Sequence, residues 1–155
     1  MNIVDFQSVA SEYTYTYIPT CLPVLLKTPT LAILTLSVLT AQFVNHYYTT
    51  FDSDRKSLAA LYRENSMLTF ESSQSLGAAS ILEKLTNLPF QKIKHHISAL
   101  DSQPTPNGGI IILVTGQLAV DDETNPLAYS QAFQLCQDPA GQWFVFNDIF
   151  KLVIG

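Results

Sequence analysis

Positive charge is scarce in this sequence, which carries 8 lysines and arginines against 13 aspartates and glutamates and has a formal net charge of -5. A nucleic-acid binder needs a basic surface to neutralise phosphates, so this balance argues against that class and leaves a basic protein partner plausible. Cysteine is equally scarce, because Cys21 and Cys136 stand alone, far apart, with no Cys/His cluster around them. We therefore expect a reducing compartment, no disulfide framework, and neither a metal site nor a cofactor.

Long uninterrupted hydrophobic runs are missing as well. The most apolar stretch, residues 28–44, is rich in threonine and at the short edge of what spans a bilayer. Asp5 and Glu12 precede it, whereas a secretory signal begins with basic residues. The sequence therefore predicts neither a membrane span nor a signal peptide, and its 155 residues, 47% of them hydrophobic, fit one domain with a substantial core.

Residues 12–41 differ in character from both of their flanks. If they are removed, FQSVAS (6–11) joins QFVNHYYTTF (42–51), and apolar residues then recur at the spacing of one amphipathic helix. The members of this stripe are Phe6, Val9, Ala10, Phe43, Val44, Tyr47, Tyr48 and Phe51. Residues 12–41 are therefore interpreted as a 30-residue insertion within a helix.

The helical pattern survives when the insertion is kept. Leu36 and Leu39 extend it upstream of Phe43 and take the positions of Phe6 and Val9. We predict a helix over residues 30–50, a displaced and poorly ordered segment over 1–29, and a domain over 30–155. The insertion is a whole number of codons, compatible with a short unspliced intron, and we favour that interpretation over a segment of the working protein.

The remaining chain predicts two helices with a short strand between them, followed by four further strands. A cap signal of Asp and Ser predicts a short helix over 52–62, alternation predicts a strand over 66–71, and helical spacing predicts a helix over 77–88 that ends before Pro89. β-Branched and aromatic residues then predict strands over 92–100, 109–120, 129–137 and 142–153, separated by turn sequences. This order indicates an α+β fold, a curved and mostly antiparallel sheet wrapped around its helices.

Several stretches in order resemble the nuclear transport factor 2 family: FVNHYYTTFDSDR, LAALYRENSMLTFE, LEKLTNLPFQKIKHHI, DSQPTPNG, VTGQLAVDDE and FVFNDIFKL. The resemblance covers residues 42–152, and residues 5–11 match the first helix turns. It implies a cone-shaped α+β homodimer that binds the GDP form of the small GTPase Ran and Phe-Gly repeats of nucleoporins, and carries Ran into the nucleus. It also implies a location in cytoplasm and nucleus, at the nuclear pore or envelope, and no enzymatic activity.

The resemblance places the Ran contacts at two kinds of residue. Acidic contacts fall on Glu71, Asp121 and Glu123, which would pair with basic residues of Ran; a solvated turn is the alternative for the last two. An apolar cavity that receives an aromatic side chain of Ran would be formed by Phe70, Leu88, Phe90, Ile93, Leu118, Val120, Ile149 and Phe150. Ordinary core packing explains each of these eight equally well when it is taken singly.

The groove for Phe-Gly repeats is implied at Phe6, upstream of the insertion, or at Leu36 if the helix continues through the insertion. Losing one aromatic ring weakens such contacts, so we expect weaker Phe-Gly binding than in a version without residues 12–41. Dimerisation also has support from the residues, since Trp143 and Val145 on one face of the last strand, with Phe144 and Phe146 on the other, predict a sheet covered on both faces.

Two other functions compete with transport. Related cones house isomerases and dehydratases, for which the candidate groups are His95, His96, Asp101, Tyr129 and Asp148. His95 and His96 are adjacent in a predicted strand and must point to opposite faces, so they cannot form one catalytic pair. We expect Asp148 to be a structural hydrogen-bond acceptor or a partner contact. A scaffold that uses the fold only to dimerise is the third interpretation.

Overall fold

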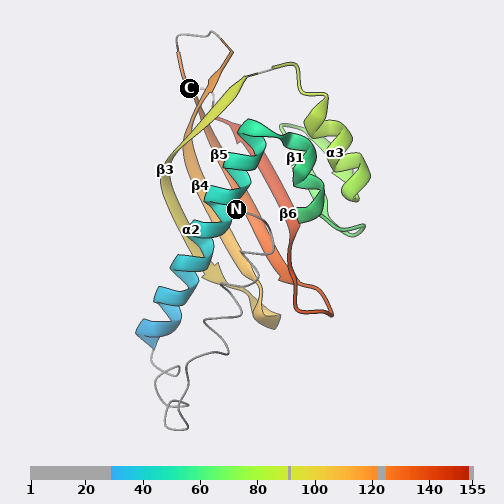
Figure 1. Ribbon diagram of the computed structural model, residues 1–155. Helices are drawn as coiled ribbons and strands as arrows, with labels where there is room; N and C mark the ends of the chain where they lie inside the picture. Colours follow the sequence, from blue (N-terminus) through green and yellow to red (C-terminus); the bar gives the residue numbers. More distant parts are fainter. Residues whose placement is uncertain (1–28, 91, 122–124, 154–155) are drawn as a thin grey trace. The chain divides into compact units, whose positions relative to one another are not determined.

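The computed structural model describes residues 29–90, 92–121 and 125–153. It divides into two compact units, Met1–His46 and Tyr47–Gly155. The described part of the first unit is the beginning of helix α2 (Pro29–Ser53), which continues into the second unit (Figure 1). Pro29 occupies the first helical position, where a missing N–H costs no hydrogen bond, and neither proline nor glycine follows before Ser53. The predicted helix over 30–50 is thus confirmed, whereas the displaced segment predicted over 1–29 lies outside the described residues except for Pro29.

In the second unit, α2 is followed by η2 (Arg55–Leu61), a 3-10 helix of 7 residues. The predicted cap is present, because Asp54 accepts hydrogen bonds from the backbone N of Lys56 at 3.1 Å and from Ser57 Oγ at 2.6 Å. Leu58 and Leu61 are the buried residues of this 3-10 helix.

A hairpin and a helix come next. Strand β1 (Met67–Phe70) lies within the predicted 66–71 strand, and β2 (Ser73–Leu76), which pairs with it, was not predicted. Helix α3 (Ala78–Thr86) is confirmed within 77–88 and begins after Gly77, whose positive φ of 85° suits glycine.

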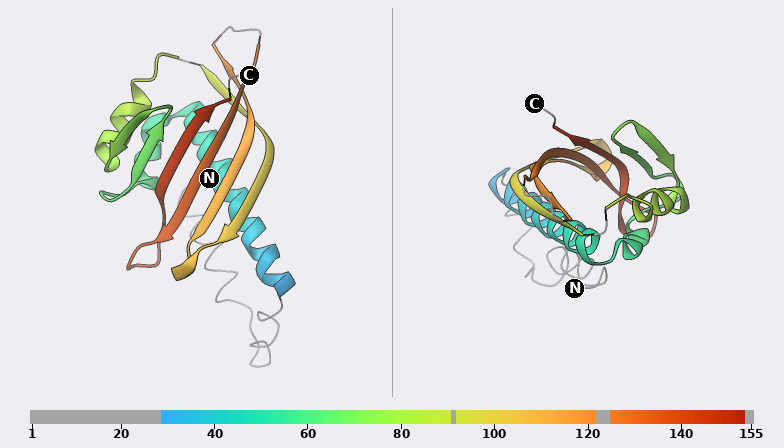
Figure 2. Two further views of the ribbon diagram at one scale, coloured as in Figure 1. Left: turned by 180° about the vertical axis from the view of Figure 1, so that it is seen from behind. Right: turned by 90° about the horizontal axis from the view of Figure 1, so that it is seen from above.

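The long strands complete one six-stranded sheet in the order β2-β1-β6-β5-β4-β3. Every neighbouring pair is antiparallel except β1 with β6, and the sheet curves visibly when seen from above (Figure 2). The α+β class with a curved, mostly antiparallel sheet is therefore confirmed. The remaining elements are β3 (Ile93–Pro104), η3 (Pro106–Gly108), β4 (Ile110–Val120), β5 (Leu127–Gln137) and β6 (Trp143–Leu152).

A β-bulge in β6 sets which residues face inward. Gln134 pairs with Asn147 and Leu135 pairs with Val145, so Phe146 is the extra residue. The alternation shifts by one at this point, and Val145 and Asp148, three positions apart, are both completely buried.

Glycine is required once inside the sheet. Gly116 of β4 pairs with Tyr129 of β5, and a Cβ at position 116 would lie against the carbonyl oxygen of His96 and 2.9 Å from Tyr129 Cε1. The absent side chain therefore leaves the space that the Tyr129 ring fills.

Candidate functional site

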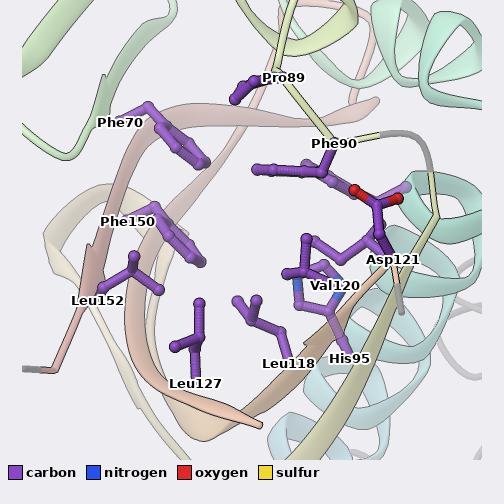
Figure 3. A pocket seen from close by; sticks show the side chains of 12 residues that line it. Phe70, Pro89, Phe90, His95, Leu118, Val120, Asp121, Leu127, Phe150 and Leu152 are labelled. Atoms are coloured by element: carbon purple, nitrogen blue, oxygen red, sulfur yellow. The ribbon is translucent and has the colours of Figure 1, made fainter. Parts of the chain in front are cut away.

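An apolar cavity of about 330 Å³ opens within the second unit (Figure 3). Its wall combines the last turn of α2, the segment before β3, and the ends of the five strands β1, β3, β4, β5 and β6. The lining residues are Phe51, Phe70, Pro89, Phe90, Ile93, His95, Leu118, Val120, Asp121, Leu127, Phe150 and Leu152. Six of the eight residues predicted for a cavity are thus brought together, and one of the predicted acidic residues joins them.

Strand pairing arranges the aromatic wall of the cavity. Phe70 and Phe150 are partners in the parallel β1–β6 register, and their rings stack at 4.6 Å between centroids with planes 5° apart. Phe150 also stacks on Tyr129, at 5.6 Å and 17°. Neighbouring strands therefore build an aromatic wall of stacked rings, and such a wall suits an aromatic guest.

Two predicted cavity residues do not line it. Ile149 is 49% exposed and lies on the other face of β6, because adjacent residues of a strand point to opposite faces. Leu88 is half-buried just after α3 and is not part of the lining, whereas Pro89 and Phe90 are. Neither residue belongs to the described lining, and for Ile149 the reason is that resemblance by position does not resolve which face of a strand a residue occupies.

The acidic residues at the rim are held in place by backbone hydrogen bonds. Glu71 and Asp121 each follow a strand and adopt positive φ values of 57° and 48°. Glu71 Oε1 accepts from the backbone N of Leu152 at 2.6 Å, and Asp121 Oδ1 accepts from the backbone N of Lys92 at 2.8 Å. Both carboxylates therefore keep a fixed direction beside cavity residues. Glu123, the third predicted acid, lies outside the described residues.

A cation reinforces the wall near Phe90. The guanidinium of Arg55 lies 5.3 Å from the ring centroid of Phe51 and 5.0 Å from that of Phe90, and its Nη2 donates to the Phe90 carbonyl at 3.0 Å. Burial is the largest influence on this group and lowers the pKa of Arg55. Arg55 thus joins the end of α2 to the segment before β3 through cation–π contacts.

His95 brings a polar group to the cavity wall, and its partner is Asp52. His95 Nδ1 lies 2.6 Å from Asp52 Oδ1, and the backbone N of His95 donates to Asp52 Oδ2 at 3.0 Å. The His95 side chain is only 2% exposed, whereas His96 is exposed, so the prediction of opposite faces is confirmed. The Asp52 partnership was missed, because no sequence pattern links a helix end to a strand 43 residues later.

Asp148 is buried away from the cavity in a hydrogen-bonded network. Its Oδ2 accepts from the hydroxyls of Tyr62 at 2.7 Å and Tyr47 at 3.1 Å, and its Oδ1 accepts from Gln131 Nε2 at 2.7 Å. Gln131 Oε1 in turn accepts from the Tyr48 hydroxyl at 2.9 Å. Burial raises the pKa of Asp148 to about 6, and the three donors counteract part of this rise. The expected structural acceptor is confirmed.

The other enzyme candidates do not converge on the cavity. Asp101 is exposed on β3, and Tyr129 is buried and is not part of the cavity lining. No cluster of three or more His, Cys, Asp or Glu side chains that could hold a metal ion occurs in the described part of the chain.

The predicted Phe-Gly position is described only in part. Phe6 lies outside the described residues, and its substitute Leu36 lies on α2 within the first unit. Among the described helices, α2 included, none is long and apolar enough to cross a membrane.

A curved, mostly antiparallel sheet that encloses an apolar cavity with the end of a helix defines the NTF2-like class of α+β domains. Residues 39–152 match the model of the nuclear transport factor 2 (NTF2) domain family. A solved structure of nuclear transport factor 2 from Cryptosporidium parvum is 42% identical, with a TM-score of 0.72, over 76% of this chain and 94% of that one.

Curated relatives are more similar still. Nuclear transport factor 2 of Neurospora crassa is 72% identical over 118 residues, which are 76% of this chain and 95% of the relative. Its counterpart in Emericella nidulans is 58% identical over 113 residues, 72% of this chain and 90% of the relative. The chain therefore belongs to the NTF2 domain family and has the nuclear transport role of that family, which is not an enzymatic one.

The relatives also bear on the insertion. If 118 residues are 95% of the Neurospora crassa protein, that protein has about 124 residues, about 30 fewer than the 155 of this chain. The difference is close to the length of the predicted insertion, residues 12–41.

Proposed function

We propose that this chain binds the GDP form of Ran through the apolar cavity and its acidic rim, and carries Ran into the nucleus by contacts with Phe-Gly repeats of nucleoporins. The observation that supports the proposal is an aromatic-walled cavity with two fixed carboxylates beside it, Glu71 and Asp121. An inserted aromatic ring would supply most of the affinity, about 2 to 3 kcal/mol by buried area, and the carboxylates would steer a basic partner. Such a protein works in cytoplasm and nucleus and at the nuclear pore.

The rim offers a test that preserves the structure. Glu71→Gln and Asp121→Asn each remove a charge but keep the oxygen that accepts the backbone hydrogen bond of Leu152 or Lys92. Glu64→Gln, an exposed residue in the turn before β1 that does not line the cavity, is the matched control.

Binding of purified Ran loaded with GDP or GTP would be measured by titration calorimetry and by stopped-flow association at two salt concentrations. We expect the double variant to lose affinity for Ran-GDP on the order of tenfold, mainly through slower association, with a weaker salt dependence. Unchanged association in the double variant, or equal affinity for both nucleotide forms in the parent protein, contradicts the proposal.

Homodimerisation is part of this proposal and has its own surface. Leu113 of β4, Ala132 of β5 and Ile149 of β6 are successive partners across the strands, so they form one row on the outer face of the sheet. Leu113 and Ile149 are each 49% exposed. An apolar row of this kind on a sheet face fits a second copy of the chain.

Light scattering should give twice the chain mass for the parent protein at micromolar concentration. Leu113→Lys should give the monomer mass, and Ser80→Lys, on an exposed position of α3, should remain a dimer. A parent protein that is already monomeric argues against this assembly.

Phe-Gly binding is expected to be weaker in this chain than in a variant lacking residues 12–41, because Leu36 replaces the aromatic Phe6. A pull-down on a Phe-Gly repeat peptide compares the two versions, and equal capture contradicts the expectation.

We also infer that the cavity binds and does not catalyse. A general acid and base must both reach a substrate, yet the two titratable side chains of the described lining, His95 and Asp121, already hydrogen-bond to Asp52 and to the backbone of Lys92. A dimerising scaffold without Ran binding remains the alternative, and the Ran titration distinguishes it.

A further inference from the structure

The cavity wall contains one polar ring, that of His95, and Asp52 engages one of its two nitrogens. A carboxylate can only accept hydrogen bonds, so the 2.6 Å contact with Asp52 Oδ1 places a proton on His95 Nδ1. In the neutral imidazole, Nε2 then carries a lone pair and acts as an acceptor.

The His95 ring cannot easily turn away from the cavity. It stacks on Tyr48 at 4.5 Å between centroids and meets the edges of Phe51 at 5.1 Å and Tyr129 at 5.3 Å. Figure 3 shows one nitrogen of the ring on the cavity side, and because Nδ1 is engaged by Asp52 this nitrogen is Nε2. No described residue hydrogen-bonds to Nε2, so the acceptor is available to a guest.

From this geometry we propose that the cavity is a binding site for a phenol, an aromatic ring with a hydroxyl group, and that His95 Nε2 accepts the hydrogen bond of that hydroxyl. The site is the cavity proposed above for an aromatic side chain of Ran, whereas the preference for a hydroxyl group rests on the contacts of His95 and does not require that Ran binds. The volume of about 330 Å³ lies at the lower end of the range for small-molecule sites, about 300 to 1,000 Å³. The stacked pair Phe70 and Phe150 forms an aromatic wall against which the guest ring can pack.

A guest with a hydroxyl group is favoured over an apolar guest because only the hydroxyl can donate a hydrogen bond to His95 Nε2. A guest without a donor strips water from Nε2 and leaves the acceptor unpaired in apolar surroundings, whereas a hydroxyl restores the bond. Asp121 at the cavity mouth repels anions, so a neutral phenol is favoured over an aromatic carboxylate.

Two matched pairs of probes test the site, each differing only in the hydroxyl. 2-Naphthol and naphthalene represent free phenols, and the N-acetyl amides of tyrosine and phenylalanine represent a side chain of another protein. Titrations are followed by the methyl signals of Leu118 and Leu127, which line the cavity, with Leu113 on the outer face as internal reference.

For each protein, the affinity for 2-naphthol is divided by the affinity for naphthalene. Comparing this ratio between proteins cancels the effect that a variant has on the general hydrophobicity of the cavity. We expect this ratio to be at least about tenfold higher in the parent protein than in His95→Phe, which keeps a ring but lacks Nε2. His96→Phe, on the exposed face of the same strand, should behave like the parent. Equal ratios in the parent and His95→Phe, or shifts at Leu113 in place of Leu118, overturn the proposal.

The nitrogen itself gives a reading that needs no variant. In the parent protein, the ¹⁵N shift of His95 Nε2 should move when 2-naphthol is added and stay in place with naphthalene, and an unmoved signal with both overturns the proposal even if His95→Phe fails to fold. A hydroxyl preference in the naphthol pair alone assigns the site to free phenols. The same preference in the amide pair extends it to tyrosine side chains.

Discussion

Replacing Asp148 by asparagine should flatten the dependence of folding stability on pH in mildly acidic solution. Asp148 is completely buried, and its carboxylate accepts three hydrogen bonds, from Tyr47, Tyr62 and Gln131. Burial raises its pKa from the ordinary value of 3.8 to about 6. Asparagine has the same shape but does not titrate, so the variant isolates the contribution of this proton.

The sign follows from proton binding in the two states. Because the folded pKa exceeds the unfolded one, the folded protein holds more protons than the unfolded chain between about pH 4 and pH 6. The contribution of Asp148 to stability is therefore fully present below about pH 4 and is lost as the pH rises to about 6. A difference of about 2 units, at 1.36 kcal/mol per unit, corresponds to about 3 kcal/mol.

Urea unfolding of both proteins, followed by circular dichroism at half-unit steps from pH 4 to pH 7, measures this loss. The free energy of unfolding of the parent, minus that of Asp148→Asn, should fall by about 3 kcal/mol across the window. Asp101→Asn, an exposed carboxylate on β3, should leave the profile of the parent unchanged. A difference that stays constant with pH would show that Asp148 has an ordinary pKa and would refute the reasoning.

Three further outcomes can be checked. Gly116→Ala should lower the free energy of unfolding, measured in urea, by about 1 to 3 kcal/mol, because the added Cβ meets fixed backbone. Gln117→Ala, the neighbouring control, should not lower it, and similar losses in both variants would contradict this reasoning. Arg55→Lys should cost about 1 kcal/mol by the same assay, since lysine cannot stack flat on Phe90, and no change would argue against the cation–π contacts. If residues 12–41 are an unspliced intron, mass spectrometry should not detect the tryptic peptide 28–55 in the protein from its natural source. Detection of this peptide would contradict that interpretation.

Local patterns in the sequence were enough to place most elements. The helical stripe from Leu36 through Phe51 predicted α2 although part of it belongs to the insertion, because periodicity depends only on where apolar residues fall. The four long strands were also found, with ends that differ by a few residues. The hairpin strand β2 was missed, since SQSL is short and polar and owes its conformation to pairing with β1.

The candidate site was predictable only as far as the resemblance reached. It supplied Phe70, Phe150 and Asp121, whose strands meet at the cavity. It misplaced Ile149, because the choice between the two faces depends on strand register and on the bulge at Phe146. The Asp52–His95 contact joins a helix end to a strand, and a contact of that kind leaves no periodic signal in either segment.

The rim carboxylates have a consequence for the thermodynamics of association. Glu71 and Asp121 each have a left-handed backbone conformation, and one carboxylate oxygen of each accepts a hydrogen bond from the backbone N of Leu152 or Lys92. A free acidic side chain gives up about 0.5 to 1.5 kcal/mol of rotational freedom when a partner immobilises it. These two have already lost most of that freedom during folding, so the entropy of docking should be less unfavourable than two surface acids would normally make it.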